Sequence, residues 1–154
     1  MDEGRLHLDN QLCFALYAAS RAMTQAYRPA LDRLGLTYPQ YLVLLVLWEQ
    51  DDLSLKELGA RLMLDSGTLT PLLKRLESRG FLRRVRDAED ERRTRLRLTN
   101  DGLGLRAEAH VVPESLFCHV KDEAEAEAMV ALRGQLHELT DRLRALVDPR
   151  KRVR

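Results

Sequence analysis

The sequence lacks the features that would place it in a membrane or outside the cell. It contains no run of about 18 apolar residues, which excludes an ordinary membrane-spanning helix. Its first ten residues, MDEGRLHLDN, are acidic and lack the apolar stretch of a signal peptide. Two cysteines are too few for a secreted disulfide scaffold and fit a reducing compartment, so we expect a cytoplasmic protein.

Net charge is also nearly absent, at +1 over 154 residues, but this average hides a segregation. Residues 1–53 hold 4 Lys+Arg and 7 Asp+Glu, residues 54–99 hold 12 and 7, and residues 100–154 hold 9 and 10. The middle segment is therefore +5 between arms of −3 and −1. A basic segment indicates a nucleic-acid partner, although a solvated helix surface has the same composition.

Several kinds of chemistry have no pattern to support them. The four histidines show no metal-ligand spacing, and the sequence contains neither a Gly-rich phosphate loop nor a Cys-x-x-Cys motif. We therefore expect no cofactor, no metal and no enzymatic turnover. Apolar residues make up 45% of a chain with the length of one domain, which is enough to bury a core without metal or disulfide support.

Capping residues predict a mostly helical chain. Asn10 is a candidate N-cap for a first helix that ends at Gly35, and this cap places Cys13 at position N3. Thr37, followed by Pro39 in the first turn, predicts a second helix. The residues of that second helix are nearly all apolar, so we expect it to be buried on every side.

Two shorter helices are predicted next. A capping box at Ser54 begins a helix that runs through residue 62. A following helix begins at Ser66, carries a leucine stripe and ends at Gly80. Pro71 leaves open whether Ser66 or Thr68 is the N-cap of this helix, because proline costs nothing only in the first turn.

Beyond that glycine the apolar period changes from helical to alternating. Residues 94–98 alternate with period two, which predicts a hairpin whose charged tip covers residues 87–93. A helix capped at Thr99 or Asn100 follows, and the last long helix is predicted over residues 113–146.

This order of elements is that of a winged helix-turn-helix, in which the second helix enters the major groove of DNA. The predicted helix after the turn presents hydroxyls near its start, where the helix N-terminus also attracts phosphate, and cations further along: Ser66, Thr68, Thr70, Lys74 and Arg75. At the hairpin tip, Asp90 is placed to hold Arg92 by an ion pair for a minor-groove contact. Arg95 and Arg97 share a strand face that we expect to meet solvent. The alternative is a solvated amphipathic helix followed by a charged hairpin.

The segment Asp90-Glu91-Arg92-Arg93 through Leu98-Thr99 resembles the wing signature of the MarR family (multiple antibiotic resistance regulators). The resemblance covers the whole chain and implies a single mainly α domain with a small β-wing, residues 1–154. Within it, the resemblance implies a winged helix-turn-helix over residues 37–99. Residues 1–36 and 100–154 would form the dimerisation helices of a homodimer.

The positions of the cysteines and tyrosines indicate a smaller group within the family that the chain resembles. At N3 of a helix, Cys13 would lie where the helix dipole stabilises a thiolate, although a free cysteine is more often a small buried residue. All four tyrosines lie within residues 17–41, namely Tyr17, Tyr27, Tyr38 and Tyr41. Three stretches resemble the organic hydroperoxide resistance regulators: Asn10-Gln11-Leu12-Cys13-Phe14, Tyr38-Pro39-Gln40-Tyr41 and Asp65-Ser66-Gly67-Thr68-Leu69-Thr70-Pro71.

This second resemblance implies a repressor that binds an inverted repeat in double-stranded DNA and is released by an organic hydroperoxide. It implies that Cys13 is the sensing cysteine, that Tyr27 and Tyr38 hydrogen-bond its thiolate, and that Tyr17 is a further pocket residue. Leu116-Phe117-Cys118 looks like the two-cysteine group of these regulators, in which Cys118 forms a disulfide with the partner's sensing cysteine after sulfenic acid formation. A buried Cys118 beside its phenylalanine is the alternative.

Two other functions remain open from the sequence. The first is a MarR-type repressor that is released by a reversibly bound phenolic or other small ligand, with Cys13 incidental. The second is a thiol peroxidase, which would need a reductant docking system that no motif supports.

Overall fold

A computed structural model describes residues 3–87 and 94–147, and it divides into a first unit that ends at Leu116 and a second that begins at Phe117. We describe each unit by itself. The first unit opens with two 3-10 turns, Glu3–Leu6 and Leu8–Asn10. Its helices are α1 (Leu12–Leu34), α2 (Tyr38–Glu49), α3 (Leu55–Leu62), α4 (Ser66–Ser78), α5 (Asn100–Glu108) and all but the last residue of α6 (Val111–Phe117). Its strands are β1 (Leu53–Ser54), β2 (Leu82–Arg86) and β3 (Thr94–Leu98). The second unit contains α7 (Glu123–Val147).

Helices α3 and α4 form the helix-turn-helix, and local capping sets where each begins. The Ser54 hydroxyl accepts a hydrogen bond from the Glu57 N–H, while the Glu57 carboxylate accepts one from the Ser54 N–H at 2.7 Å, so the predicted capping box is confirmed. Asp65 caps α4 by accepting from the Thr68 N–H at 2.8 Å. Gly80, with φ of 77°, follows the end of α4 as predicted.

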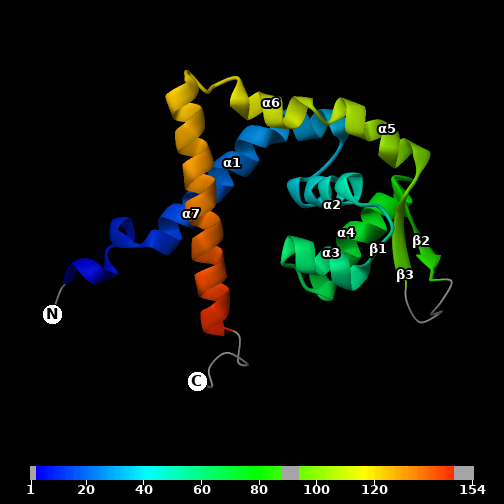
Figure 1. The fold of residues 1–154 in the computed structure, drawn as a ribbon, viewed down its shortest axis with the longest axis horizontal. Coiled ribbons are helices and arrows are strands. Elements are labelled where there is room, and N and C mark those ends of the chain that lie inside the picture. Colours follow the sequence, from blue (N-terminus) through cyan, green and yellow to red (C-terminus); the bar gives the residue numbers. More distant parts are fainter. Residues whose placement is uncertain (1–2, 88–93, 148–154) are drawn as a thin grey trace. The chain divides into compact units, whose positions relative to one another are not determined.

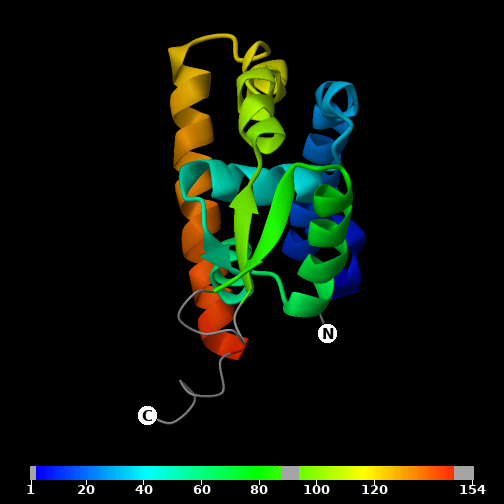
Figure 2. The ribbon, with the colours of Figure 1, turned by 90° about the vertical axis from the view of Figure 1, so that its right-hand side faces the viewer.

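The wing is a three-stranded antiparallel sheet in the order β1-β3-β2. The pairing aligns Leu82 with Leu98 and Leu53 with Leu96, which puts these buried leucines on one face, against the helices. Figure 1 shows the sheet beside α3 and α4, and Figure 2 shows α5 continuing from the end of β3. The two-residue strand β1 is too short for its period to have been recognised in the sequence.

Leucines from every element of the helix-turn-helix and wing make the core. Leu44, Leu58, Leu69, Leu73 and Leu76 are at most 1% exposed. Helix α2 crosses this core and is buried along most of its length, as its apolar run predicts. The fold class, mainly α with a small β-wing, is therefore confirmed.

The start of α1 differs from the prediction. Gln11 is the N-cap, and Cys13 is at N2 rather than N3. The Asn10 side chain instead donates to the Gly4 carbonyl at 2.8 Å, within the 3-10 turns that precede the helix. The cysteine nevertheless lies in the first turn of the helix, where the backbone N–H groups have no acceptor within the helix.

The long helix predicted over residues 113–146 is interrupted, and this prediction is wrong. Helix α6 ends at Phe117 and α7 begins at Glu123. The Asp122 carboxylate accepts from the Glu125 N–H at 2.9 Å, while the Glu125 carboxylate accepts from the Lys121 N–H at 2.8 Å. The Asp-x-x-Glu spacing is therefore a helix start signal inside the acidic run.

Pro71 lies inside α4, because neither Ser66 nor Thr68 is the cap. Proline has no N–H, so one backbone hydrogen bond of this helix is lost.

No helix in the described residues is long and apolar enough to cross a membrane. The division of the chain into a winged helix-turn-helix over residues 37–99 and dimerisation segments over residues 1–36 and 100–154 stays a prediction.

Candidate functional site

The exposed side of α4 carries all five residues predicted there for DNA contact. Ser66, Thr68, Thr70, Lys74 and Arg75 are exposed, whereas the leucine stripe faces the core. The Thr70 hydroxyl donates to the Ser66 carbonyl at 2.6 Å, inside the helix. Lys74 and Arg75 have no ion-pair partner within residues 3–87 and 94–147. Their charge is therefore available to a phosphate.

The first turn of α4 is not the open phosphate site that we expected. The Asp65 carboxylate accepts from the Thr68 N–H and, at 3.1 Å, from the Thr68 hydroxyl. The Thr68 backbone N–H is the main cause of the lowered pKa of Asp65. A negative charge thus already occupies this end of the helix dipole, and a phosphate would meet the cations further along the helix.

The wing contains an ionic cluster that sequence reasoning missed. Asp52 stands before β1 with a left-handed φ of 61°. Its carboxylate accepts from the Arg95 Nε at 2.9 Å and from the Arg97 Nε and Nη2 at 2.8 and 3.0 Å. These hydrogen bonds, that of Arg97 first, lower the pKa of Asp52 to about 2. The two arginines share a face as predicted, but they bind a carboxylate there, from more than 40 residues away in the sequence.

Asp90 and Arg92, the tip residues predicted to contact DNA, lie outside the described residues. Their role stays a prediction.

The predicted sensing cysteine lies on an exposed face of α1. Cys13 is an exposed thiol, and Tyr17 follows it one turn later on the same side of the helix. The Tyr17 hydroxyl accepts a hydrogen bond from Arg21 Nη1 at 2.8 Å, and the guanidinium carbon lies 5.5 Å from the tyrosine ring centroid. Because its oxygen is the acceptor, the Tyr17 hydroxyl keeps its hydrogen for another partner.

The other tyrosines cluster where α1 meets α2. Tyr27 and Tyr38 stack with ring centroids 5.7 Å apart, and Tyr41 lies 6.4 Å beyond Tyr38. Burial, and to a lesser extent the neighbouring Tyr38, raise the pKa of Tyr27, and burial also raises the pKa of Tyr41. These two phenols therefore stay protonated and can donate hydrogen bonds at neutral pH.

Within one chain, the structure does not bring Cys13 to the Tyr27–Tyr38 pair. Cys13 and Tyr27 lie on the same helix, 14 residues apart. At about 1.5 Å per residue this separation is about 21 Å, which exceeds the combined reach of the two side chains. Cys118 is an exposed thiol in the second unit, between α6 and α7. Within the single chain Cys118 is therefore not buried, contrary to the alternative expected from the sequence.

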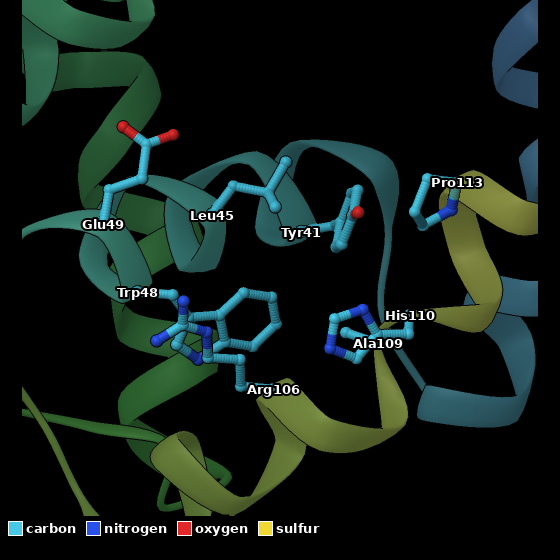
Figure 3. A pocket seen from close by; sticks show the side chains of 8 residues that line it. All are labelled: Tyr41, Leu45, Trp48, Glu49, Arg106, Ala109, His110 and Pro113. Atoms are coloured by element: carbon cyan, nitrogen blue, oxygen red, sulfur yellow. The ribbon is translucent and has the colours of Figure 1, made fainter.

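A cavity that the sequence did not predict lies between α2, α5 and α6 (Figure 3). Its volume is about 210 Å³. Tyr41, Trp48, Leu45 and Pro113 supply apolar walls, and Arg106 and His110 supply the nearby nitrogen atoms. Helix α2 is distant in sequence from the α5–α6 segment, so no local sequence pattern predicts the cavity that they form.

Comparison with known proteins shows that the chain is similar to transcriptional regulators. A family model described as Transcriptional regulator SarA/Rot matches residues 25–108. The HTH-type transcriptional regulator TtmR of Methylorubrum extorquens is 52% identical over 84% of this chain and 69% of its own length. The organic hydroperoxide resistance transcriptional regulator of Bacillus subtilis is 47% identical over 90% of this chain and 92% of its own.

Among solved structures, AbfR of Staphylococcus epidermidis is similar in several states. Reduced AbfR bound to DNA has a TM-score of 0.78 with 37% identity, covering 96% of this chain and 100% of that one. Overoxidized AbfR bound to DNA gives 0.69 with 39% identity over 90% and 99%, and disulfide-formed AbfR gives 0.65 with 37% identity over 93% and 96%. The chain therefore belongs to the MarR family of transcriptional regulators, within the group of organic hydroperoxide resistance regulators.

Proposed function

We propose that this protein is a repressor that binds an inverted repeat in double-stranded DNA as a homodimer and releases it when an organic hydroperoxide oxidises Cys13. The exposed face of α4, with Lys74 and Arg75 unpaired among the described residues, supports DNA binding. AbfR, which shares the fold, has been solved on DNA. In a dimer, two α4 helices would address half-sites about 34 Å apart.

Exposed apolar side chains support the homodimer. Helix α7 contains no buried residue, yet it exposes Met129, Val130, Leu132, Leu136 and Leu143. The first half of α1 likewise exposes Leu12, Phe14 and Met23. A second copy of the chain would cover these faces, which lie in the predicted dimerisation segments 1–36 and 100–154.

The observation that carries the sensing proposal is the position of Cys13, exposed in the first turn of α1 about 21 Å from the tyrosine pair. In the homodimer we assign the partner's Tyr27 and Tyr38 as the phenols that donate to the Cys13 thiolate. The thiolate attacks the terminal peroxide oxygen, the S–O bond forms and the O–O bond breaks. The products are a sulfenic acid and an alkoxide, which takes a proton to become the alcohol.

Cys118 would then resolve the sulfenic acid. Its thiol sulfur attacks the oxidised sulfur of the partner's Cys13, a disulfide forms and water leaves. AbfR supports this step, because it has been solved in a disulfide form, whereas its overoxidized form was solved bound to DNA. We therefore assign release to the disulfide rather than to oxidation of a single sulfur.

Fluorescence anisotropy on the operator tests the scheme. The reduced protein should bind, cumene hydroperoxide should release it, and dithiothreitol should restore binding. Cys13→Ser should stay bound at the same peroxide dose, and Cys118→Ser should stay bound although its Cys13 is oxidised. Release of Cys13→Ser at that dose would refute the sensing role. Non-reducing electrophoresis after oxidation tests the disulfide. A disulfide-linked dimer band that persists in Cys118→Ser would refute Cys118 as the partner of Cys13.

The cavity beside Tyr41 supports a second candidate, release by a reversibly bound small ligand. In that case a phenolic compound should release both the wild type and Cys13→Ser without any oxidant. Failure of phenolic compounds to shift the affinity of either protein would eliminate this candidate.

A further inference from the structure

Arg79 connects the end of α1, the sensor helix that carries Cys13, to the end of α4, the recognition helix that carries the predicted DNA contacts. It is the first residue after α4, yet its side chain reaches the C-terminus of α1. Its Nη1 donates to the Gly35 carbonyl, and its Nη2 donates to the Leu34 carbonyl at 3.2 Å. The guanidinium carbon also lies 4.7 Å from the ring centroid of Phe81, at the start of the wing.

The C-terminus of α1 needs such a donor. The last carbonyls of a helix have no helical N–H to accept from. Here the Leu31 and Asp32 carbonyls accept from the Leu36 and Gly35 N–H groups, each at 3.0 Å. The Gly35 and Leu34 carbonyls take Arg79 instead, at the negative end of the helix dipole.

Gly35 leaves the space for this contact. Its φ is 63°, a conformation that glycine adopts at little cost. A Cβ at this position would lie 2.7 Å from Arg79 Nη2, too close for the guanidinium to stay. Backbone conformation and side-chain space thus both favour glycine where Arg79 binds.

Helix α1 is fixed to the rest of its unit mainly at this end. Its buried residues are Ala30, Leu31 and Leu34, all in the last two turns, while Cys13 lies exposed at the other end. Figure 1 shows the first half of α1 leaving the cluster of α2, α3 and α4. Since α1 has 23 residues, it is about 34 Å long, and a displacement at the Cys13 end reaches α4 through the last turns.

We propose that Arg79 is a positioning residue that couples α1 to α4, so that a movement of the sensor helix changes the placement of the recognition helix. The inference rests on the proposed redox release. It assigns the two carbonyl hydrogen bonds and the contact with Phe81 as the link, beside the apolar packing of Leu31 and Leu34.

The test is the ratio of operator Kd values after and before oxidation by cumene hydroperoxide, which measures the coupling. Arg79→Met keeps the stem but removes the donors, and it should lower this ratio by about tenfold, as expected when a charge-assisted hydrogen bond contributes to coupling. Arg33→Met is the matched control, because Arg33 is exposed in the same last turn of α1. Its ratio should equal that of the wild type.

Thermal unfolding of each reduced variant shows whether it is folded at the assay temperature. If Arg79→Met is not folded, Arg79→Gln takes its place, because the amide loses the charge and the two-pronged guanidinium geometry but keeps one donor nitrogen. An unchanged ratio in the folded Arg79 variant, beside a large wild-type ratio, overturns the coupling role alone. A wild-type ratio of one overturns the redox release and this inference with it.

Discussion

Two glycines in α5 should respond oppositely to alanine. Gly102 is buried, and a Cβ there would lie 1.9 Å from the Phe81 carbonyl oxygen and 2.9 Å from its carbon. Both are backbone atoms, so the start of α5 must move by about 1 Å or more, given the usual packing separation of about 3.5 Å. Gly104 lies two residues later in the same helix, and a Cβ there meets nothing within 4 Å.

The displacement at Gly102 would break two hydrogen bonds. Trp48 Nε1 donates to the Gly102 carbonyl at 2.8 Å, and the Thr99 N–H donates to the Phe81 carbonyl at 3.1 Å. Each donor left unsatisfied costs about 1–3 kcal/mol. Because alanine returns about 1 kcal/mol of helix propensity, the net loss for Gly102→Ala is about 1–5 kcal/mol. Gly104→Ala keeps only the gain of about 1 kcal/mol.

Thermal unfolding at one fixed protein concentration measures both variants, because a dimer's Tm depends on concentration. At about 2–4 °C per kcal/mol, Gly102→Ala should lower the Tm by roughly 2–20 °C, whereas Gly104→Ala should raise it by about 2–4 °C. Equal shifts of the same sign would refute the steric reasoning.

The remaining predictions concern charge and capping. The contribution of Asp52 to stability should be present above its usual pKa of 3.8 and be lost only as the pH falls toward 2, because its ion pairs lower its pKa to about 2; a carboxyl NMR titration midpoint near 3.8 would contradict this. Ser54→Ala should lower the free energy of unfolding by about 1 kcal/mol through loss of the N-cap, and urea unfolding measures it; no change would show that water replaces the cap. Arg75→Ala should weaken operator binding and reduce the slope of log K against log salt by about 1, and an unchanged slope would place Arg75 away from phosphate.

Features that depend on neighbouring residues were predictable from the sequence. Ser54 and Glu57 are three residues apart, and this spacing alone fixes the start of α3. The alternation of residues 94–98 identified β3 because the strand period of two is a local property. The break after Phe117 was also locally encoded, by the capping residues at the start of α7, but it was masked by the acidic run.

Features that depend on distant residues were not predictable. Asp52 has an unremarkable sequence context, and its role follows from the pairing of β1 with β3, which brings Arg95 beside Ser54. The reach of Arg79 to Gly35 spans 44 residues and depends on how α1 and α4 are packed. The tyrosine pair matched a family pattern, yet the length of α1 shows that one chain cannot bring that pair to its own cysteine.

The Asp52 cluster changes what the charge segregation along the chain means. Arg95 and Arg97 belong to the +5 segment, but their charges are held by a carboxylate from the acidic first arm. Arg61, another cation of that segment, pairs with Glu49 of the same arm. The acidic first arm and the basic middle segment are therefore interleaved in space, although they are separate along the sequence. Only cations without a carboxylate partner displace counterions from DNA. The number of counterions that this protein releases from DNA should therefore be smaller than the number of arginines in the +5 segment suggests.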